Sequence, residues 1–182
     1  MISLSKISWV FRYFIYSLIY KNIKMPGYIG KPVHLKNIKR FKFAKNVRIF
    51  PHSRLEVYGN GTIEINENVS IGQNIHVTSA GKLIIKSGTL ITANVCITNI
   101  DHEYEDIDVP VLSQSMKVTD TIIGENCFIG TGVMIQAGTR LGKHNIIGAN
   151  SVVRGEFPDY CVIAGSPARI IKKYNEESKR WE

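Results

Sequence analysis

The amino-acid sequence predicts an all-β protein, a parallel β-helix, and one stretch carries most of that prediction. Residues 123–153 divide into blocks of six, each opened by a branched aliphatic residue: Ile123, Ile129, Ile135, Leu141, Ile147 and finally Val153. Glycine follows the aliphatic residue in four of the five complete blocks. A period of six drifts around a helix of 3.6 residues per turn, whereas short strands joined by tight corners place every sixth side chain inside a coil. The second-position glycine suits a crowded corner or a positive φ.

The six-residue spacing extends toward the N-terminus with interruptions. Ile65, Ile71 and Val77 are six apart, and after two inserted residues the spacing resumes at Ile85, Ile91 and Ile97. Pro51 and the turn residues 59–61 disturb it further upstream. With 182 residues the chain is long enough to bury a core of its own. We therefore expect a β-helix domain at 49–173, preceded by a basic helical and irregular segment at 1–48 and followed by a short tail at 174–182.

A loop at residues 98–121 interrupts the repeat. It carries one lysine, one histidine (His102) and six acids, which are Asp101, Glu103, Glu105, Asp106, Asp108 and Asp120. A long excursion from a regular solenoid is a common place for a binding or catalytic function.

The N-terminal segment holds the excess of positive charge. Residues 1–50 contain eleven Lys or Arg and no acid, in a chain whose net charge is +8. Residues 7–20 predict a helix whose apolar stripe consists of Ile7, Val10, Phe11, Phe14, Ile15, Leu18 and Ile19. It is too short to span a bilayer and has no signal-peptide cleavage site. Two interpretations stay open: a helix packed on the coil or a neighbouring subunit, or a peripheral association of residues 1–24 with the anionic inner membrane surface. We expect no nucleic-acid binding, because no recognised motif accompanies the bases.

The three cysteines, Cys96, Cys127 and Cys161, are odd in number and widely spaced. This pattern is typical of small buried apolar residues in a reducing, cytoplasmic compartment, without a disulfide framework or a metal motif.

The repeat blocks, the loop with Asp101-His102 and the ending 162–173 (VIAGSPARIIKK) together resemble the hexapeptide-repeat acyltransferases. The most similar branch is that of the galactoside, maltose and lipopolysaccharide or capsule O-acetyltransferases, and the resemblance covers roughly residues 60–173. It implies a left-handed parallel β-helix, a homotrimer with active sites between subunits, and acetyl-CoA as co-substrate without a required metal. The expected activity is O-acetylation of a sugar hydroxyl in a bacterial surface polysaccharide, such as O-antigen or capsule, or in its precursor.

The resemblance also implies site residues. His102 matches the family's catalytic histidine, and a neutral imidazole suits the deprotonation of a hydroxyl. Asp101 is a candidate for orienting it or contacting the acceptor, and Asn74 and His76 are candidates for contacting the acceptor sugar. The expected CoA-binding residues are Gly130, Thr131, Gly148, Ala149 and Ser151 along the pantetheine arm, with Arg169 and Lys172 at the phosphates.

Three alternatives remain open. Transfer to an amino-sugar nitrogen would use the same donor, and a β-helix could also serve as a non-enzymatic binding module. A zinc enzyme of the γ-carbonic anhydrase type would need three histidines, but His76, His102 and His144 do not have that family's spacing.

Overall fold

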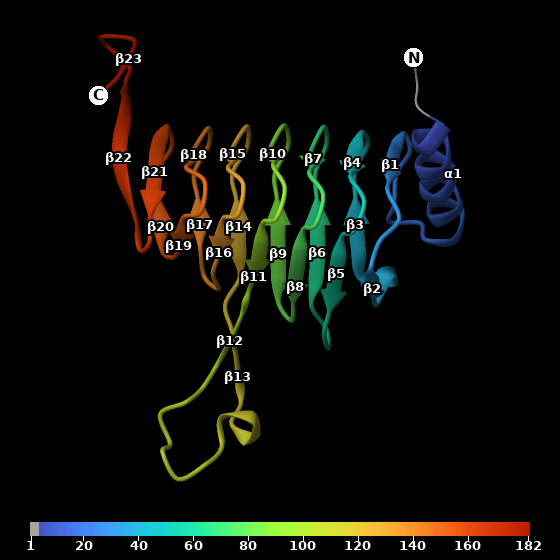
Figure 1. Cartoon of the computed structure of the whole chain (residues 1–182), viewed down its shortest axis with the longest axis horizontal. Helices are drawn as coiled ribbons and strands as arrows, with labels where there is room; N and C mark the ends of the chain where they lie inside the picture. The colour runs from blue at the N-terminus through green and yellow to red at the C-terminus, as the bar shows by residue number, and fades with distance from the viewer. Residues whose placement is uncertain (1–3) are drawn as a thin grey trace.

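The structure, a computed structural model, describes residues 4–182 and consists of one helix, α1 (Leu4–Ile19), followed by a coil of short strands (Figure 1). Three parallel sheets form the walls of the coil. Sheet I has nine strands in the order β1 (Gly27–Ile29), β4 (Val47–Ile49), β7 (Ser70–Ile71), β10 (Leu90–Ile91), β15 (Phe128–Ile129), β18 (Ile146–Ile147), β21 (Cys161–Gly165), β22 (Ala168–Asn175) and β23 (Arg180–Trp181). The last two strands, β22 and β23, pair antiparallel and fold the C-terminal residues over the end of the coil.

The other two walls have six strands each. Sheet II contains β2 (His34–Lys36), β5 (Arg54–Val57), β8 (His76–Ser79), β11 (Cys96–Thr98), β16 (Met134–Ile135) and β19 (Val152–Val153). Sheet III contains β3 (Phe41–Phe43), β6 (Thr62–Ile65), β9 (Lys82–Ile85), β14 (Thr121–Ile123), β17 (Arg140–Leu141) and β20 (Glu156–Phe157). The chain visits sheets I, II and III in turn, so the predicted β-helix is confirmed. Two short 3-10 helices, η1 (Ile38–Arg40) and η2 (Val111–Ser113), lie in the connections.

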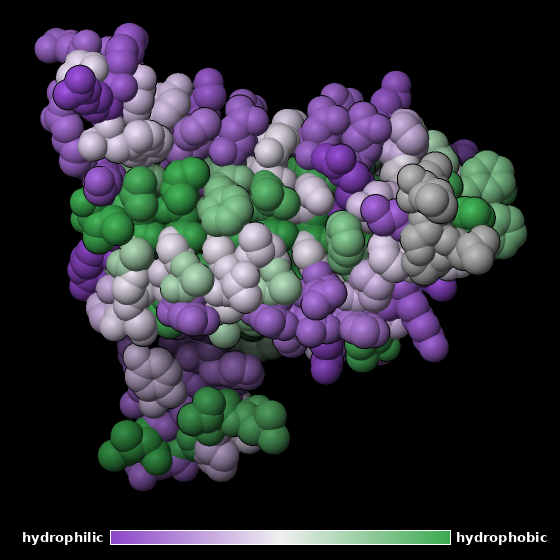
Figure 2. All heavy atoms as spheres, turned by 45° about the horizontal axis from the view of Figure 1, so that its top comes forward, coloured by the Kyte–Doolittle hydropathy of each residue, from purple (hydrophilic) through white to green (hydrophobic). Residues whose placement is uncertain are grey.

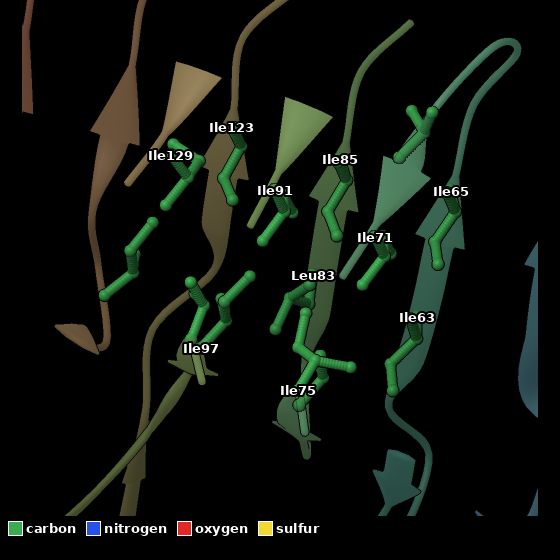
Figure 3. Packing of buried hydrophobic residues seen from close by; sticks show 14 of the residues in the cluster. Ile63, Ile65, Ile71, Ile75, Leu83, Ile85, Ile91, Ile97, Ile123 and Ile129 are labelled. Atoms are coloured by element: carbon green, nitrogen blue, oxygen red, sulfur yellow. The ribbon is translucent and has the colours of Figure 1, made fainter. Parts of the chain in front are cut away.

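The core is a stack of aliphatic side chains inside the coil. Ile71, Ile91 and Ile129 pair in register on successive strands of sheet I and are fully buried (Figure 3). Sheet II repeats the arrangement with Val77, Ile97 and Ile135. Each inward position therefore packs on its equivalent one turn away, which is why a spacing of six in the sequence becomes a column in space.

The second-position glycines relieve crowding, and none of them has a positive φ. A Cβ on Gly130 would lie 2.7 Å from the backbone nitrogen of Ala149 on the next turn. Asparagines at other corner positions adopt the left-handed conformation instead, among them Asn68, Asn94 and Asn126. Asparagine tolerates that region because its side chain hydrogen-bonds locally. The predicted crowding is thus confirmed and the suggested positive φ at these glycines is wrong.

The coil begins earlier than residue 49. Strands β1 to β3 lie at residues 27–43 and form its first turn, and β4 begins the second, so this part of the segment 1–48 belongs to the β-helix wall. The inward side chains Ile29, Phe41 and Val47 are buried there. The spacing of six is already present at Ile23, Ile29, Leu35, Phe41 and Val47, but the second-position glycine occurs only after Ile29.

Helix α1 closes the open end of this first turn. Tyr13 is fully buried over Gly27, and Trp9 packs against the rings of Tyr28 and Phe50. Arg12 donates a hydrogen bond of 3.0 Å to the carbonyl of Ile29, on the edge of β1 that no strand covers. The packed face is therefore the one with Trp9 and Tyr13, and the predicted apolar stripe from Ile7 to Ile19, which one of the two interpretations placed against the coil, is the exposed face. No helix within residues 4–182 is long and apolar enough to cross a membrane.

Candidate active site

The loop at 98–121 leaves the coil at the corner between sheets II and III and projects away from it (Figure 1). Its two arms form an antiparallel hairpin of β12 (Ile100–His102) and β13 (Met116–Val118). His102 lies opposite Met116 at the far end of this ladder. A regular two-stranded stem holds the histidine at a set distance from the coil, because its backbone is fixed by the ladder hydrogen bonds.

The root of the hairpin is fixed by buried polar side chains. Asn99 is fully buried, donates to Ser79 Oγ over 3.0 Å and accepts from the Ala80 backbone amide over 2.9 Å. Thr121 Oγ1 donates to the Thr98 carbonyl over 2.9 Å and so joins the outgoing and returning arms. Sequence analysis did not single out Asn99, although an asparagine at a break in the repeat is a signal that could have found it.

His102 has an exposed side chain that makes no side-chain hydrogen bond or ion pair within residues 4–182. Asp101 points to the other face of β12, where its carboxylate is 2.9 Å from the guanidinium of Arg154. The acid beside the histidine in sequence therefore anchors the stem to the coil. Asp101, His102, Glu103, Lys117 and Arg154 help to line a hollow of about 330 Å³ at the hairpin.

Two expected acceptor residues lie on the coil. Asn74 is a corner residue with a φ of 56°, and its amide donates to the Asn94 side chain over 3.1 Å. His76 lies on the outer face of sheet II, beside Cys96 of the strand that leads into the loop. Neither Asn74 nor His76 is adjacent to His102 in the sequence or in the sheet. Asn74 precedes β8 and His76 is its first residue, whereas the loop follows the end of β11.

His76 faces a buried carboxylate that sequence analysis missed. Glu56 is 4% exposed and accepts two hydrogen bonds from Arg54, of 2.8 and 3.1 Å. The His76 Nε2 atom is 3.2 Å from Oε2, the oxygen that also accepts from Arg54 Nε. The hydrogen bonds from Arg54 lower the pKa of Glu56 to about 2, with a further contribution from His76. An ionised carboxylate in this position fixes both basic side chains on the sheet surface.

The expected CoA residues gather along a different corner. Gly130 and Thr131 connect β15 to β16, and Gly148 and Ala149 connect β18 to β19, so all four stand at the corner between sheets I and II. Thr131 donates to Thr92 Oγ1 over 3.1 Å on the turn before. The corner thus presents a row of small residues one turn apart, against which a thin chain can lie. Sheet II separates this corner from the loop root of the same chain.

The remaining expected donor residues differ in character. Ser151 is buried, and its hydroxyl donates to Gly148 and accepts from the Gly165 amide, so it supports the corner from inside. Arg169 and Lys172 are exposed on β22, at the C-terminal end of the coil. Only these two of the expected donor residues could meet phosphates through a charge.

The three histidines of the zinc alternative lie apart. His144 stacks on Trp181, near the C-terminal hairpin, whereas His102 is on the loop and His76 is beside Glu56. Within the part of the chain that the structure describes, no three His, Cys, Asp or Glu residues are grouped to hold a metal ion.

Comparison with known proteins places this geometry in a family. The model "Bacterial transferase hexapeptide (six repeats)" matches residues 120–155. The "Putative lipopolysaccharide biosynthesis O-acetyl transferase WbbJ" of Escherichia coli is 34% identical over 172 residues, with 91% of this chain and 86% of that protein covered. The galactoside O-acetyltransferase of Escherichia coli is 30% identical over 125 residues, covering 68% of this chain and 60% of the relative.

Solved structures share the fold. AntD, an N-acyltransferase from Bacillus cereus in complex with dTDP and 3-hydroxybutyryl-CoA, superposes with a TM-score of 0.77 at 17% identity, covering 94% of this chain and 92% of that one. A galactoside acetyltransferase in complex with coenzyme A gives a TM-score of 0.67 at 23% identity, covering 98% and 87%. Together with the repeat match and the sequence relatives, these findings show that the chain belongs to the hexapeptide-repeat acetyltransferases and is an acetyl-CoA-dependent acyltransferase.

Proposed function

We propose that this enzyme transfers the acetyl group of acetyl-CoA to a sugar hydroxyl of a bacterial surface polysaccharide or its precursor, with His102 as general base. One observation carries the proposal: His102 stands exposed on a paired hairpin stem, and Asp101 beside it is engaged with Arg154. The relative named as a lipopolysaccharide biosynthesis O-acetyl transferase supports the acceptor class.

The chemistry follows from the reacting groups. A ring nitrogen of neutral His102 takes the proton of the sugar hydroxyl as its oxygen attacks the thioester carbonyl. The carbonyl oxygen becomes an oxyanion in the tetrahedral intermediate, where backbone N–H donors would stabilise it. The intermediate collapses with cleavage of the C–S bond, and the imidazolium returns the proton to the departing thiolate. The products are the sugar acetate ester and CoA.

The donor would lie along the corner formed by Thr131 and Ala149, with Arg169 and Lys172 at its phosphates. The loop projects away from the corner of its own chain, on the other side of sheet II (Figure 1). We therefore propose that His102 acts on the donor held by a neighbouring subunit, in a homotrimer with one shared site at each interface.

Two apolar surfaces support that assembly. A row of Leu90, Phe128, Ile146 and Val162 lies in register on the outer face of sheet I, next to the donor corner. Figure 2 shows a hydrophobic band along this side of the coil and a second hydrophobic patch on the loop. Ile107 and Leu112 of the loop are 93% and 91% exposed in the single chain. Exposed apolar surface of this extent is typical of subunit contacts.

The enzyme would act in the cytoplasm or at the inner face of the plasma membrane, where precursors of surface glycans are available to acetyl-CoA. The acceptors to be compared in an assay therefore range from free sugars and nucleotide sugars to lipid-linked glycans. Transfer to an amino-sugar nitrogen is the alternative outcome of the same assay.

The test measures thiol release from acetyl-CoA over a panel of these acceptors, with product analysis by mass spectrometry and mild base treatment. Wild type is compared with His102→Asn, and His52→Asn is the matched control, since asparagine tolerates the positive φ of exposed His52. Acceptor-dependent release that collapses only in His102→Asn, with a base-labile ester as product, supports the proposal. If His102→Asn releases thiol as fast as His52→Asn and wild type, His102 is not the base. A base-stable amide product overturns O-transfer.

A further inference from the structure

The exposed face of α1 is apolar between Ile7 and Ile19. Ile7, Phe11, Phe14, Leu18 and Ile19 all lie on the side away from the coil, and Phe11 and Leu18 are 63% and 68% exposed. Arg12, the charge in the middle of the helix, is turned inward onto the Ile29 carbonyl. Ser17, at the margin of the face, donates to the Phe14 carbonyl over 2.7 Å and so leaves no open hydroxyl donor there. The fold thus directs polar groups away from this surface.

A hollow deepens the apolar face. Ile7, Val10, Phe11, Phe14 and Met25 line a depression of about 440 Å³ between the helix and the following turn. All five lining side chains are apolar. A depression of this kind accepts a hydrocarbon chain and offers nothing to a polar ligand.

Positive charge surrounds the face. Lys6, Lys21 and Lys24 are exposed at the ends of the helix and just beyond it. Lys39, Arg40 and Lys42, with Asn22, line a polar hollow on the first turn of the coil nearby. Because residues 1–50 contain no acid at all, this end of the molecule complements an anionic surface.

We propose that α1 docks the enzyme on an anionic lipid surface, with the exposed apolar face among the acyl chains and the lysines at the headgroups. A basic amphipathic helix of this kind lies in the interface plane and does not span the bilayer. A second copy of the chain fits the face less well, because it would bring Lys6, Lys21 and Lys24 of the two copies toward one another.

The coil then stands upright on the membrane. The helix covers the end of the coil (Figure 1), and its exposed face points away from the strands. In a trimer of parallel coils all three helices would face one plane, so their weak individual affinities would combine. The hairpin bearing His102 starts at the turn of β10 and β11, three strand steps from β1, which is about 14 Å along the coil.

This geometry restricts the class of acceptor molecule that can reach His102, an inference that rests on the proposed function. Because the outer half of the helix is sunk into the headgroup layer, only the inner half adds to this distance, and the hairpin stands about 15 to 20 Å above the headgroups. An acceptor sugar at that height is a few units out from a lipid anchor. The acceptor class is therefore a lipid-linked oligosaccharide presented from the same membrane.

The test is co-sedimentation of the full-length protein with vesicles of phosphatidylcholine containing phosphatidylglycerol, and with vesicles of phosphatidylcholine alone. The variant Phe11→Ser/Leu18→Ser removes apolar surface from the face, and Ile171→Ser is the matched control, since Ile171 is 59% exposed at the opposite end of the coil. We expect binding to the anionic vesicles that weakens with salt, falls about tenfold or more in the double variant and is unchanged in the control.

Other outcomes overturn the docking. The proposed docking of α1 on lipid is wrong if the wild-type protein stays in the supernatant. It is also wrong if the double variant sediments like wild type. A double variant that changes oligomeric state in light scattering shows that the face is a subunit contact. Thiol release with a water-soluble acceptor is measured on the same samples and reports on the proposed function separately, because that activity needs no membrane.

Discussion

Replacing Glu56 by glutamine tests the buried carboxylate beneath His76. The carboxylate is 4% exposed and its pKa is lowered from an ordinary 4.5 to about 2, chiefly by the hydrogen bonds from Arg54. A difference of that size corresponds to about 3 kcal/mol of preferential stabilisation of the charged form. Arg54 and His76 are half exposed, so solvent screening reduces the expected effect to about 2 kcal/mol.

The sign of the pH dependence follows from the lowered pKa. The contribution is fully present above pH 4.5, the ordinary pKa, and is lost as the pH falls toward about 2, where the folded carboxylate is protonated. Glu56→Gln should therefore be less stable than wild type by about 2 kcal/mol at neutral pH, and the difference should shrink steadily below about pH 4.5.

The assay is urea unfolding followed by circular dichroism at fixed protomer concentration, from pH 7 to the lowest pH at which wild type stays folded. Glu64→Gln is the control, because Glu64 pairs with the half-exposed Lys42 over 2.9 Å and should contribute no more than about 1 kcal/mol. A Glu56→Gln variant as stable as wild type at neutral pH, or a deficit that does not change with pH, would refute the reasoning.

Three further changes test other contacts. Tyr13→Ala empties the buried contact of α1 on the coil and should lower the unfolding free energy by about 3 to 5 kcal/mol, measured by urea unfolding; a change below about 1 kcal/mol would contradict this packing. Gly130→Ala should cost about 1 to 3 kcal/mol, seen as a lower melting temperature, since its Cβ would meet the Ala149 backbone at 2.7 Å. Arg154→Gln breaks the half-exposed pair with Asp101, so it should leave stability within about 1 kcal/mol yet lower kcat, because the hairpin stem loses its anchor. An unchanged kcat would show that the pair does not position His102.

The columns of the core were predictable from the sequence because each inward residue recurs at a fixed spacing. Ile123, Ile129 and Ile135 are fully buried, as that spacing requires. The first turn was missed because only Ile29 in it is followed by glycine, the second sign on which the prediction depended. The aliphatic spacing alone, from Ile23 to Val47, would have found it.

The orientation of α1 could not be read from its pattern. Two apolar faces recur at helical spacing, one being the stripe from Ile7 to Ile19 and the other formed by Trp9, Tyr13, Tyr16 and Tyr20. The open end of the coil decides between them, because it offers rings to Trp9 and a bare glycine to Tyr13. Partners of this kind are fixed by tertiary packing and leave no trace in the helix itself.

The candidate site was likewise predictable from the sequence only in part. His102 was found from the break in the repeat, since a break marks a loop wherever the coil runs. Its surroundings were not, because Arg154 reaches Asp101 across 53 residues of sequence, and Glu56 and His76 meet across 20. Contacts between turns of a coil depend on the exact number of residues in each turn, and insertions such as the one before Ile85 shift that register.

Mixed trimers test the central claim most directly, that His102 of one subunit acts on the donor held by the next. Subunits carrying His102→Asn are co-expressed with subunits carrying Ala149→Trp, which fills the donor corner at an exposed position. Each variant alone should be inactive in acceptor-dependent thiol release. With equal amounts of the two subunits, the co-expressed population should recover about a quarter of the wild-type rate, because about one interface in four joins an intact loop to an intact corner. Mixed trimers as inactive as the parent variants would contradict a site shared between subunits.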